Sequence, residues 1–355
     1  MRIAQVAPLY ESVPPQLYGG TERVVSFLTE ELVRQGHDVT LFASGDSVTS
    51  ARLVPICSRS LRLDRQCIDQ IAHHILLLER VFSEREHFDI IHFHIDYLHF
   101  PLTRRYGPVN VTTLHGRLDI PDLQPLYREY YDMPVVSISN AQRTPLSWIN
   151  WQGTVHHGLP KSQFRFSPKA EGYLAFLGRI SPEKGLDRAI EIAKRADMPL
   201  RIAAKVDRVD RDYFQAVIKP QLDHPLIEFI GEIGYPEKNE FLGNAAALLF
   251  PINWPEPFGL VMIEAMACGT PVIAFSCGSV PEVMSDGVSG FVVNDIGSGV
   301  DAVKRVEKLD RRGVRLCFEK RFTATRMAND YLAIYERLLG GEPETLTLTD
   351  GVSVG

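Results

Sequence analysis

PEPFGLVMIEAMACGTPVIA, residues 255–274, carries a loop, a helix and the beginning of a strand in one short stretch. The apolar run ALLFPI comes just before it and is typical of a buried strand. We predict a helix over 259–268, because Gly269 and Pro271 follow it as stop signals. PVIAF then resumes a strand pattern. Strand, helix and strand in this order favour a parallel sheet, whose neighbouring strands need a helix-length connection.

The same alternation extends outward through both halves of the chain. In the first half it predicts helices over 21–35 and 68–86 and the strands RIAQVAP, DVTLFAS, DIIHFHI, VNVTTLH and PVVSIS. In the second half it predicts helices over 185–195 and 323–339 and the strands YLAFLGR, LRIAAKV and LIEFIG. We therefore predict an α/β chain with two Rossmann-like parallel-sheet domains facing each other across a cleft, with ligands at the carboxyl ends of the strands. The expected domains are 1–163 and 164–320, followed by a terminal helix at 321–340 and a flexible tail at 341–355.

Composition and charge exclude several classes of function. The net charge of -6 over 355 residues argues against a nucleic-acid-binding protein, which normally has a basic face. Residues 1–160 contain arginine but no lysine, so no polybasic membrane patch is expected, although peripheral membrane contact stays open. No apolar run is long enough to span a bilayer. Five cysteines without CxxC spacing are typical of reduced thiols in the cytoplasm.

Two carboxylates frame the helix of the opening segment. Glu256 lies in the loop before this helix and Glu264 lies inside it, eight residues later. The amino end of such a helix offers unpaired N–H groups that attract phosphate. A second helix start follows Gly19 and Gly20, where backbone N–H groups could also approach a phosphate, although a plain turn is the commoner reason for two glycines.

With the Glu-x7-Glu spacing of Glu256 and Glu264, the chain resembles the family 4 retaining glycosyltransferases of the GT-B fold. The resemblance covers nearly the whole chain. It includes YGGTERVVSFLTEELVRQGHDVTLFA near the start, FLGRISPEKGLDRAIEIAK, GSVPEVMSDGVSGFVV, and RFTATRMANDYLAIYERLL near the end. It implies that the N-terminal domain holds the acceptor, that the C-terminal domain holds the nucleotide sugar, and that the terminal helix returns to the N-terminal domain.

The resemblance also implies roles for individual residues. Arg179 and Lys184 would hold the diphosphate, Arg as a two-pronged donor and Lys as a point charge. Glu256 would bind hydroxyls of the transferred sugar and Glu264 the ribose. His115 would stabilise an oxocarbenium-like transition state and would not act as a nucleophile. The remaining expected donor contacts are Gly19, Gly20, Glu232 beside the base, and the segment Pro257, Phe258, Gly259 and Leu260.

The expected reaction is a metal-independent, retaining transfer of a hexose from a nucleotide-diphosphate sugar to an acceptor hydroxyl. No cofactor is expected. UDP is the favoured nucleotide, with GDP as the alternative. Lys205 stands where many relatives have a glycine-rich turn, so it could reach the phosphates or the base and change the nucleotide preference. The leaving phosphate would take the acceptor's proton, with attack on the face from which the diphosphate departs.

A cluster of histidines raises a different possibility. His92, His94 and Asp96 alternate in HFHID, so on a strand they would share one face and could bind a metal. The next residue is Tyr97, however, where the His-x-His-x-Asp signature of metal hydrolases continues with histidine. We expect instead that His94, Asp96 and Tyr97 border the acceptor, together with loops around 46–66 and 117–132.

Three other functions remain open from the sequence. A nucleotide-sugar epimerase or hydrolase would need an acid–base pair, for which His115 and Glu256 are the candidates. A dinucleotide oxidoreductase is disfavoured, because no GxGxxG follows a predicted strand. A metal-dependent hydrolase using His92, His94 and Asp96 is the least favoured. The acceptor could be a glycan, a lipid-linked sugar or a small metabolite.

Overall fold

The computed structural model describes residues 1–16 and 19–340, and the tail predicted at 341–355 lies outside this range. Its first half contains β1 (Arg2–Val6), α1 (Gly20–Arg34), β2 (Asp38–Ala43), β3 (Arg52–Pro55), α2 (Gln70–Ser83), β4 (Ile90–Phe93), α3 (Phe100–Tyr106), β5 (Asn110–Thr113), α4 (Leu123–Glu129), β6 (Val135–Ser137), α5 (Asn140–Arg143) and β7 (Trp151–Thr154). Its second half contains β8 (Leu174–Arg179), α6 (Leu186–Ala196), β9 (Leu200–Lys205), α7 (Arg211–Tyr213), β10 (Ile227–Gly231), α8 (Tyr235–Gly243), β11 (Ala247–Phe250), α9 (Leu260–Cys268), β12 (Val272–Phe275), α10 (Val280–Val283), β13 (Gly290–Val293), α11 (Ile296–Val303), α12 (Arg311–Arg321) and α13 (Ala324–Leu338).

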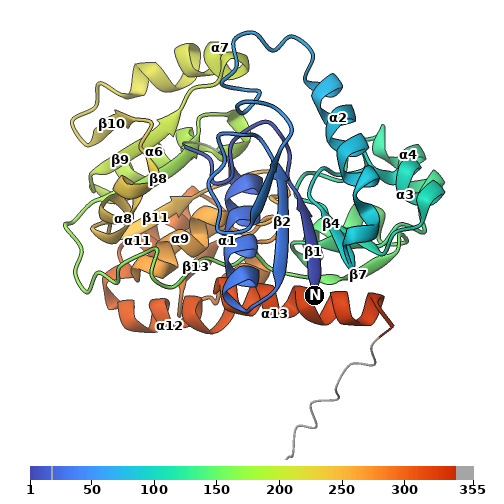
Figure 1. Ribbon diagram of the computed structural model, residues 1–355. Helices are drawn as coiled ribbons and strands as arrows, with labels where there is room; N and C mark the ends of the chain where they lie inside the picture. The colour runs from blue at the N-terminus through green and yellow to red at the C-terminus, as the bar shows by residue number, and fades with distance from the viewer. Residues whose placement is uncertain (17–18, 341–355) are drawn as a thin grey trace, which may run out of the picture.

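Two parallel sheets form the frame of the molecule (Figure 1). The first has seven strands in the order β3-β2-β1-β4-β5-β6-β7, and the second has six in the order β10-β9-β8-β11-β12-β13. In each sheet the chain works outward from the first strand and then returns to that strand's other side. The strand order therefore reverses between β1 and β4 and again between β8 and β11. Ligands of such sheets bind at these reversal points, just beyond the carboxyl ends of the strands.

Apolar side chains cover both faces of each sheet, as parallel sheets require. In the first sheet α1 and α13 pack on one face and α2 on the other. Ile3 and Ala4, neighbours on β1, accordingly belong to different clusters of buried side chains. In the second sheet α6 and α11 cover one face, and α9 with its neighbours α8 and α12 covers the other. The predicted α/β fold with two Rossmann-like sheets is confirmed.

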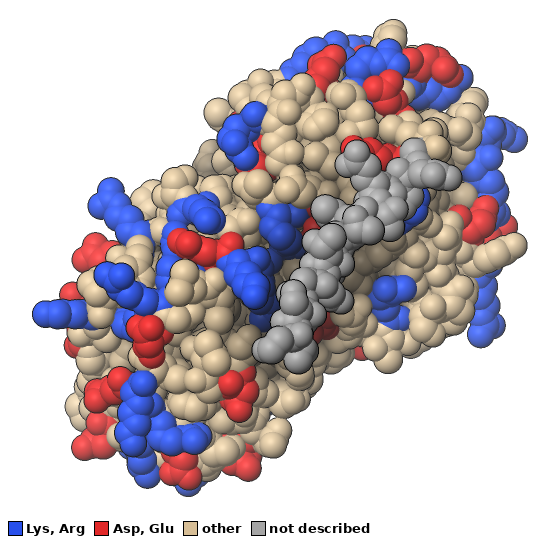
Figure 2. Space-filling model, turned by 90° about the horizontal axis from the view of Figure 1, so that it is seen from below, with Lys and Arg blue, Asp and Glu red and all other residues tan. Residues whose placement is uncertain are grey.

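The last two helices join the halves along one side of the molecule. α12 contacts α9 of the second half, and α13 packs against α1 of the first. Both run along the bottom of Figure 1. On the face seen from below, basic and acidic side chains are interspersed, with no stripe of one sign (Figure 2). None of the helices within residues 1–16 and 19–340 combines the length and apolar character that crossing a membrane requires.

One detail of the predicted strands is wrong. The strand expected at DIIHFHI ends at Phe93, and Asp96 has a φ of 51°, in the left-handed region that non-glycine residues seldom occupy. His92, His94 and Asp96 therefore do not share one strand face. The chain turns away after the strand, and this turn carries Asp96 to the reversal point of the first sheet.

Candidate active site between the two sheets

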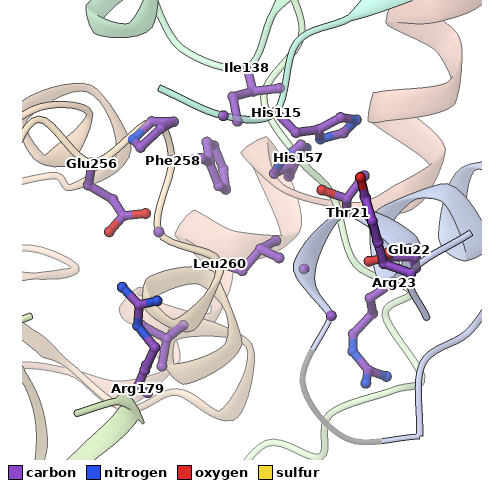
Figure 3. A pocket seen from close by; sticks show the side chains of 18 of the residues that line it. Thr21, Glu22, Arg23, His115, Ile138, His157, Arg179, Glu256, Phe258 and Leu260 are labelled. Carbon is purple, nitrogen blue, oxygen red and sulfur yellow. The ribbon is translucent and has the colours of Figure 1, made fainter. Parts of the chain in front are cut away.

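A cavity of about 960 Å³ lies between the carboxyl ends of the two sheets. Residues from both halves line it. They include every site residue predicted from the sequence except His92: Gly19, Gly20, His94, Asp96, Tyr97, His115, Arg179, Lys184, Lys205, Glu232, Glu256, Pro257, Phe258, Gly259, Leu260 and Glu264. Figure 3 shows Glu256, Phe258, Leu260 and Arg179 on one side, Thr21–Arg23 opposite, and His115 with His157 between them. The structure thus gathers these residues around one cavity.

The loop before α9 is held by the segment that follows β12. The Ser279 backbone N–H donates to the Glu256 carbonyl at 3.0 Å, and the Ser279 hydroxyl donates to the Phe258 carbonyl at 2.8 Å. Gly278 lies so close that a Cβ there would be 2.4 Å from the Glu256 nitrogen. Gly259 has a φ of 81° and caps α9. These contacts fix the carboxylate of Glu256 at the cavity mouth and aim the start of α9 inward.

Each of the two predicted carboxylates forms an ion pair with a lysine. Lys184 donates a hydrogen bond to Glu256 and also lies over the Trp254 ring, 4.7 Å from its centre. Lys238 donates to both oxygens of Glu264, at 2.9 and 3.1 Å. Both pairs are largely shielded from solvent. The carboxylates are therefore held as charged hydrogen-bond acceptors, suited to sugar hydroxyls.

The cations nearest the end of β8 stand among acids. Arg179 lies 2.5 Å from Glu183 and within 4 Å of Asp210 and Asp207. Lys205, at the end of β9, lies 3.1 Å from Asp207. A diphosphate bound here would have to compete with these carboxylates for Arg179 and Lys205.

His115 is a neutral imidazole. Burial lowers the pKa of its side chain to about 3. Its Nε2 lies 2.9 Å from His94 Nδ1, and its ring stacks on His157 with the centres 5.4 Å apart. His157 in turn meets Phe258 edge to face. The pair His115 and His157 therefore connects the first sheet to the loop that carries Glu256.

Asp96 reaches the cavity from the end of β4. Asp96 is exposed toward the cavity, yet the protein packed around its carboxyl group desolvates it and raises its pKa to about 6. Tyr97, beside it, packs edge to face on Tyr127. From the two loops expected near the acceptor, Arg62 and Arg117 line the cavity, and Arg62 donates to Glu11 at 2.9 Å. This half of the cavity thus offers both a carboxyl group and guanidinium groups.

The histidine cluster is engaged by protein groups. Both ring nitrogens of His92 lie 2.7 Å from hydroxyl oxygens, and both nitrogens of His94 lie within 3 Å of other side chains. Across residues 1–16 and 19–340, no group of three or more His, Cys, Asp and Glu side chains is placed to hold a metal ion. Together these facts argue against a metal-binding role for His92, His94 and Asp96.

Among the cavity residues that sequence reasoning missed, three contact predicted ones. Lys238 lies on α8, in a segment with no recognisable motif, and only its contact with Glu264 reveals it. His157 was visible as part of the pair in VHHGLP, but nothing in the sequence placed it beside His115. Trp254 lies next to Glu256 in the chain, and its aromatic ring beside PEPFG was a signal that could have been used.

Two family models match the chain. The model described as "Glycosyltransferase Family 4" matches residues 18–150, and the one described as "Glycosyl transferases group 1" matches residues 161–314. Among curated proteins, the D-inositol 3-phosphate glycosyltransferase of Mycolicibacterium smegmatis is 33% identical over 208 residues, which are 51% of this chain and 44% of that protein. An uncharacterised 41.2 kDa protein of the Klebsiella pneumoniae cps region is 31% identical over 173 residues, 46% of each chain. The chain thus spans less than half the length of these relatives.

Solved structures share the fold over nearly the whole chain. AviGT4, a glycosyltransferase involved in avilamycin A biosynthesis, superposes with a TM-score of 0.73 at 24% identity, over 96% of this chain and 99% of its own. Sucrose-phosphate synthase from Thermosynechococcus elongatus gives 0.78 at 17% identity over the same shares. HepE from Anabaena, solved with UDP-glucose, gives 0.69 at 16% identity, over 96% and 100%.

Proposed function

The chain belongs to the family 4 glycosyltransferases, with a group 1 glycosyl transferase region in its second half, and from this we propose that it transfers a hexose from UDP-hexose to an acceptor hydroxyl. In this proposal the anomeric configuration is retained and no metal is required. GDP-hexose is the second choice of donor. The acceptor is a glycan, a lipid-linked sugar or a small metabolite. The five cysteines, all free thiols, favour the cytoplasm as the site of action.

The single observation that carries the proposal is the pair of lysine–carboxylate contacts on one wall of the cavity. Lys184 with Glu256 and Lys238 with Glu264 set two anchored acceptors along the loop and start of α9, beside Arg179. A nucleotide sugar has hydroxyls at both ends, on the sugar and on the ribose, and a diphosphate between them. Two acceptors separated by cations and a helix start match this pattern. HepE was solved with UDP-glucose, which supports UDP as the nucleotide.

The chemistry follows from where charge develops. When the sugar–phosphate bond breaks, negative charge grows on the diphosphate, and Arg179, Lys184 and the α9 N–H groups would stabilise it. Positive charge grows on the sugar ring. A neutral His115 does not repel this charge, whereas an imidazolium would. Glu256 would orient the sugar through its hydroxyls. The departing phosphate would accept the proton of the acceptor hydroxyl, which attacks on the same face.

An epimerase or hydrolase that uses His115 and Glu256 as acid and base is disfavoured. With a pKa of about 3, His115 is not the imidazolium that a general acid requires at neutral pH. Glu256 is committed to Lys184.

Nucleotide binding tests the proposal first. We would measure thermal stabilisation by UDP, GDP, ADP and TDP, each with and without EDTA, and then repeat any positive result with Glu264→Gln and Arg179→Ala. A nucleotide at a hundred times its Kd adds about 2.7 kcal/mol to the free energy of unfolding, which shifts the melting temperature by several degrees. The expected result is a shift by UDP that persists in EDTA and is lost in both variants. No shift by any nucleotide at millimolar concentration would refute the donor site, and a shift that EDTA abolishes would refute metal independence.

A further inference from the structure

A continuous series of hydrogen bonds runs from His115 to the terminal helix. His115 Nε2 meets His94 Nδ1 at 2.9 Å, and His94 Nε2 meets the Gln5 side-chain oxygen at 2.8 Å. The Gln5 amide nitrogen then donates to the Tyr335 hydroxyl at 3.2 Å. Gln5 on β1 and Tyr335 on α13 are both fully buried. These hydrogen bonds thus link His115 in the cavity wall to α13, whose residues do not line the cavity.

The direction of each hydrogen bond follows from Gln5. An amide oxygen can only accept, so His94 must carry its proton on Nε2. Burial lowers the pKa of His94 well below its ordinary value, so the ring is neutral and its Nδ1 can only accept. His115 must then carry its proton on Nε2. Its Nδ1 is left with a lone pair, and this buried atom has no hydrogen-bond partner within the described part of the chain.

The hydrogen bonds at the Tyr335 end of this series agree with the same direction. The Tyr335 hydroxyl accepts from Gln5 and can donate to His92 Nδ1, which lies 2.7 Å away. His92 Nε2 then donates to the Thr113 hydroxyl, also at 2.7 Å. A reversed Gln5 amide would reverse every bond and place an N–H on His115 Nδ1. That state leaves a buried donor without an acceptor, which costs more than an unused lone pair.

We infer that Gln5, held by Tyr335 of the terminal helix, fixes the tautomers of His94 and His115, so that His115 presents a neutral ring protonated on Nε2 to the cavity. Gln5 and Tyr335 are positioning residues, because neither lines the cavity. The partner of one ring nitrogen commonly determines which nitrogen of a histidine carries the proton. The titratable and charged groups around His94 and His115 are the rings of His92 and His157, the carboxyl group of Asp96 and the guanidinium of Arg326, which faces His157.

The functional meaning of this tautomer rests on the proposed glycosyl transfer. The His115 ring lines the cavity, and with the lone pair on its buried Nδ1 the ring's dipole favours a nearby developing sugar cation more than an N–H or a positive charge at that atom would. Gln5→Glu changes this directly. The carboxylate favours a doubly protonated His94, whose Nδ1–H then donates to His115 Nε2 and moves the His115 proton to Nδ1.

The test reads the tautomer itself. In protein labelled with 15N-histidine, protonated and lone-pair ring nitrogens give well-separated resonances, and His115→Asn and His94→Asn assign two of the eleven histidines. We expect Nε2–H for His115 in the natural chain and Nδ1–H in Gln5→Glu. Tyr335→Phe frees the Gln5 amide, so both tautomers should appear. Tyr331→Phe is the control, because the Tyr331 hydroxyl reaches this network only at Thr113, two hydrogen bonds beyond Tyr335, and does not contact Gln5.

Kinetics give the second readout. In Gln5→Glu and Tyr335→Phe, kcat should fall about 10- to 100-fold, the loss typical when a partner that orients a metal-ligating histidine is removed, while the Kd of UDP stays unchanged. An Nδ1–H tautomer in the natural chain, or a Tyr335→Phe spectrum identical to it, would overturn the inference. The spectra do not depend on transfer activity. If no nucleotide binds but the tautomers behave as expected, the proposed function fails and the positioning inference stands.

Discussion

Glu256 and Glu264 have the same charge and equivalent lysine partners, yet the proposed donor orientation gives them different duties. Glu256 stands at the loop with Lys184, and Glu264 stands inside α9 with Lys238. In each case Gln keeps the size of the side chain and removes its charge. The two substitutions therefore form a matched pair, in which any difference reports on the ligand.

We predict that Glu256→Gln lowers kcat/KM for UDP-hexose but leaves the Kd of UDP within about twofold, because UDP has no hexose to bind. Glu264→Gln should weaken UDP itself. A hydrogen bond to a charged group contributes about 1.5–3 kcal/mol, which corresponds to a loss of roughly 10- to 150-fold. Titration calorimetry with UDP and steady-state kinetics with UDP-hexose check both. Equal loss of UDP affinity in the two variants would contradict the orientation.

Asp96 predicts a pH dependence. Its pKa is about 6 in the folded chain, above the ordinary 3.8, so the folded state binds more protons than the unfolded state between about pH 4 and 6. The free energy of unfolding therefore falls as the pH rises through this window, and above about pH 6 the full loss is reached. We expect Asp96→Asn to raise the melting temperature at pH 7.5 and to have no effect near pH 3.5. Melting temperatures of both proteins from pH 3.5 to 8 test this prediction. A gain in melting temperature that is the same at all pH values would refute a titration of Asp96.

At this scale the sequence predicted what is local and missed what is distant. The eight-residue interval from Glu256 to Glu264 is a property of one loop and one helix, so the motif alone placed both at a common cavity. Lys238 reaches Glu264 from another helix, and Gln5 reaches Tyr335 across 330 positions. No local pattern contains such contacts. The turn at Asp96 was also hidden, because its left-handed φ occurs without a glycine to announce it.

Among the elements, α9 depends most on its first residue. Gly259 has a φ of 81°, and a Cβ there would lie 2.8 Å from Met262 and 3.1 Å from the Phe250 ring. A side chain would have to displace the start of the helix that carries Leu260 and Glu264. Strain and collision act together at this position.

We predict that Gly259→Ala lowers the free energy of unfolding by about 2–4 kcal/mol and abolishes UDP binding. Gly287→Ala is the control, because Gly287 has a similar φ of 72° but no atom within 4 Å of the added Cβ. Gly287→Ala should lower the free energy of unfolding only through the backbone preference of glycine, by about 1 kcal/mol. Urea unfolding of the three proteins gives the comparison. Equal destabilisation by both substitutions would mean that crowding at α9 is unimportant.

The elements were predictable in proportion to their apolar pattern. The helix expected at 259–268 is α9, Leu260–Cys268, and the one at 323–339 is α13, Ala324–Leu338. β3 and β7, at the edges of the first sheet, were not predicted. Edge strands have few buried residues, so RLVP and WQGT show no alternation to recognise. β13, the edge strand of the second sheet, was likewise missed.

For the whole molecule, the arrangement of the two sheets depends on contacts that cross the cleft. Glu282 on α10, in the second half, accepts the backbone N–H groups of Asn140 and Ala141 at the start of α5, each at 2.8 Å. His156, between the halves, lies 3.3 Å from the same carboxylate. These N–H groups and His156 lower the pKa of Glu282, although desolvation opposes them. The carboxylate therefore connects both halves while charged at neutral pH.

We predict that Glu282→Gln loosens this connection. A glutamine oxygen can accept from one N–H, but its amide group would face the other N–H or His156 as a second donor. The expected loss is about 1–3 kcal/mol of unfolding free energy. We also expect faster proteolysis of the linker at residues 160–172, which lies between β7 and β8, and a larger radius of gyration by small-angle X-ray scattering. Glu228→Gln is the control, because Glu228 forms an exposed ion pair with Arg201 inside the second half. If Glu282→Gln matched this control in all three measurements, the two halves would be held by α13 and the linker rather than by Glu282. In the proposed function most donor contacts lie in the second half and the acceptor contacts in the first, so a looser molecule should also show a higher KM for both substrates with little change in UDP affinity.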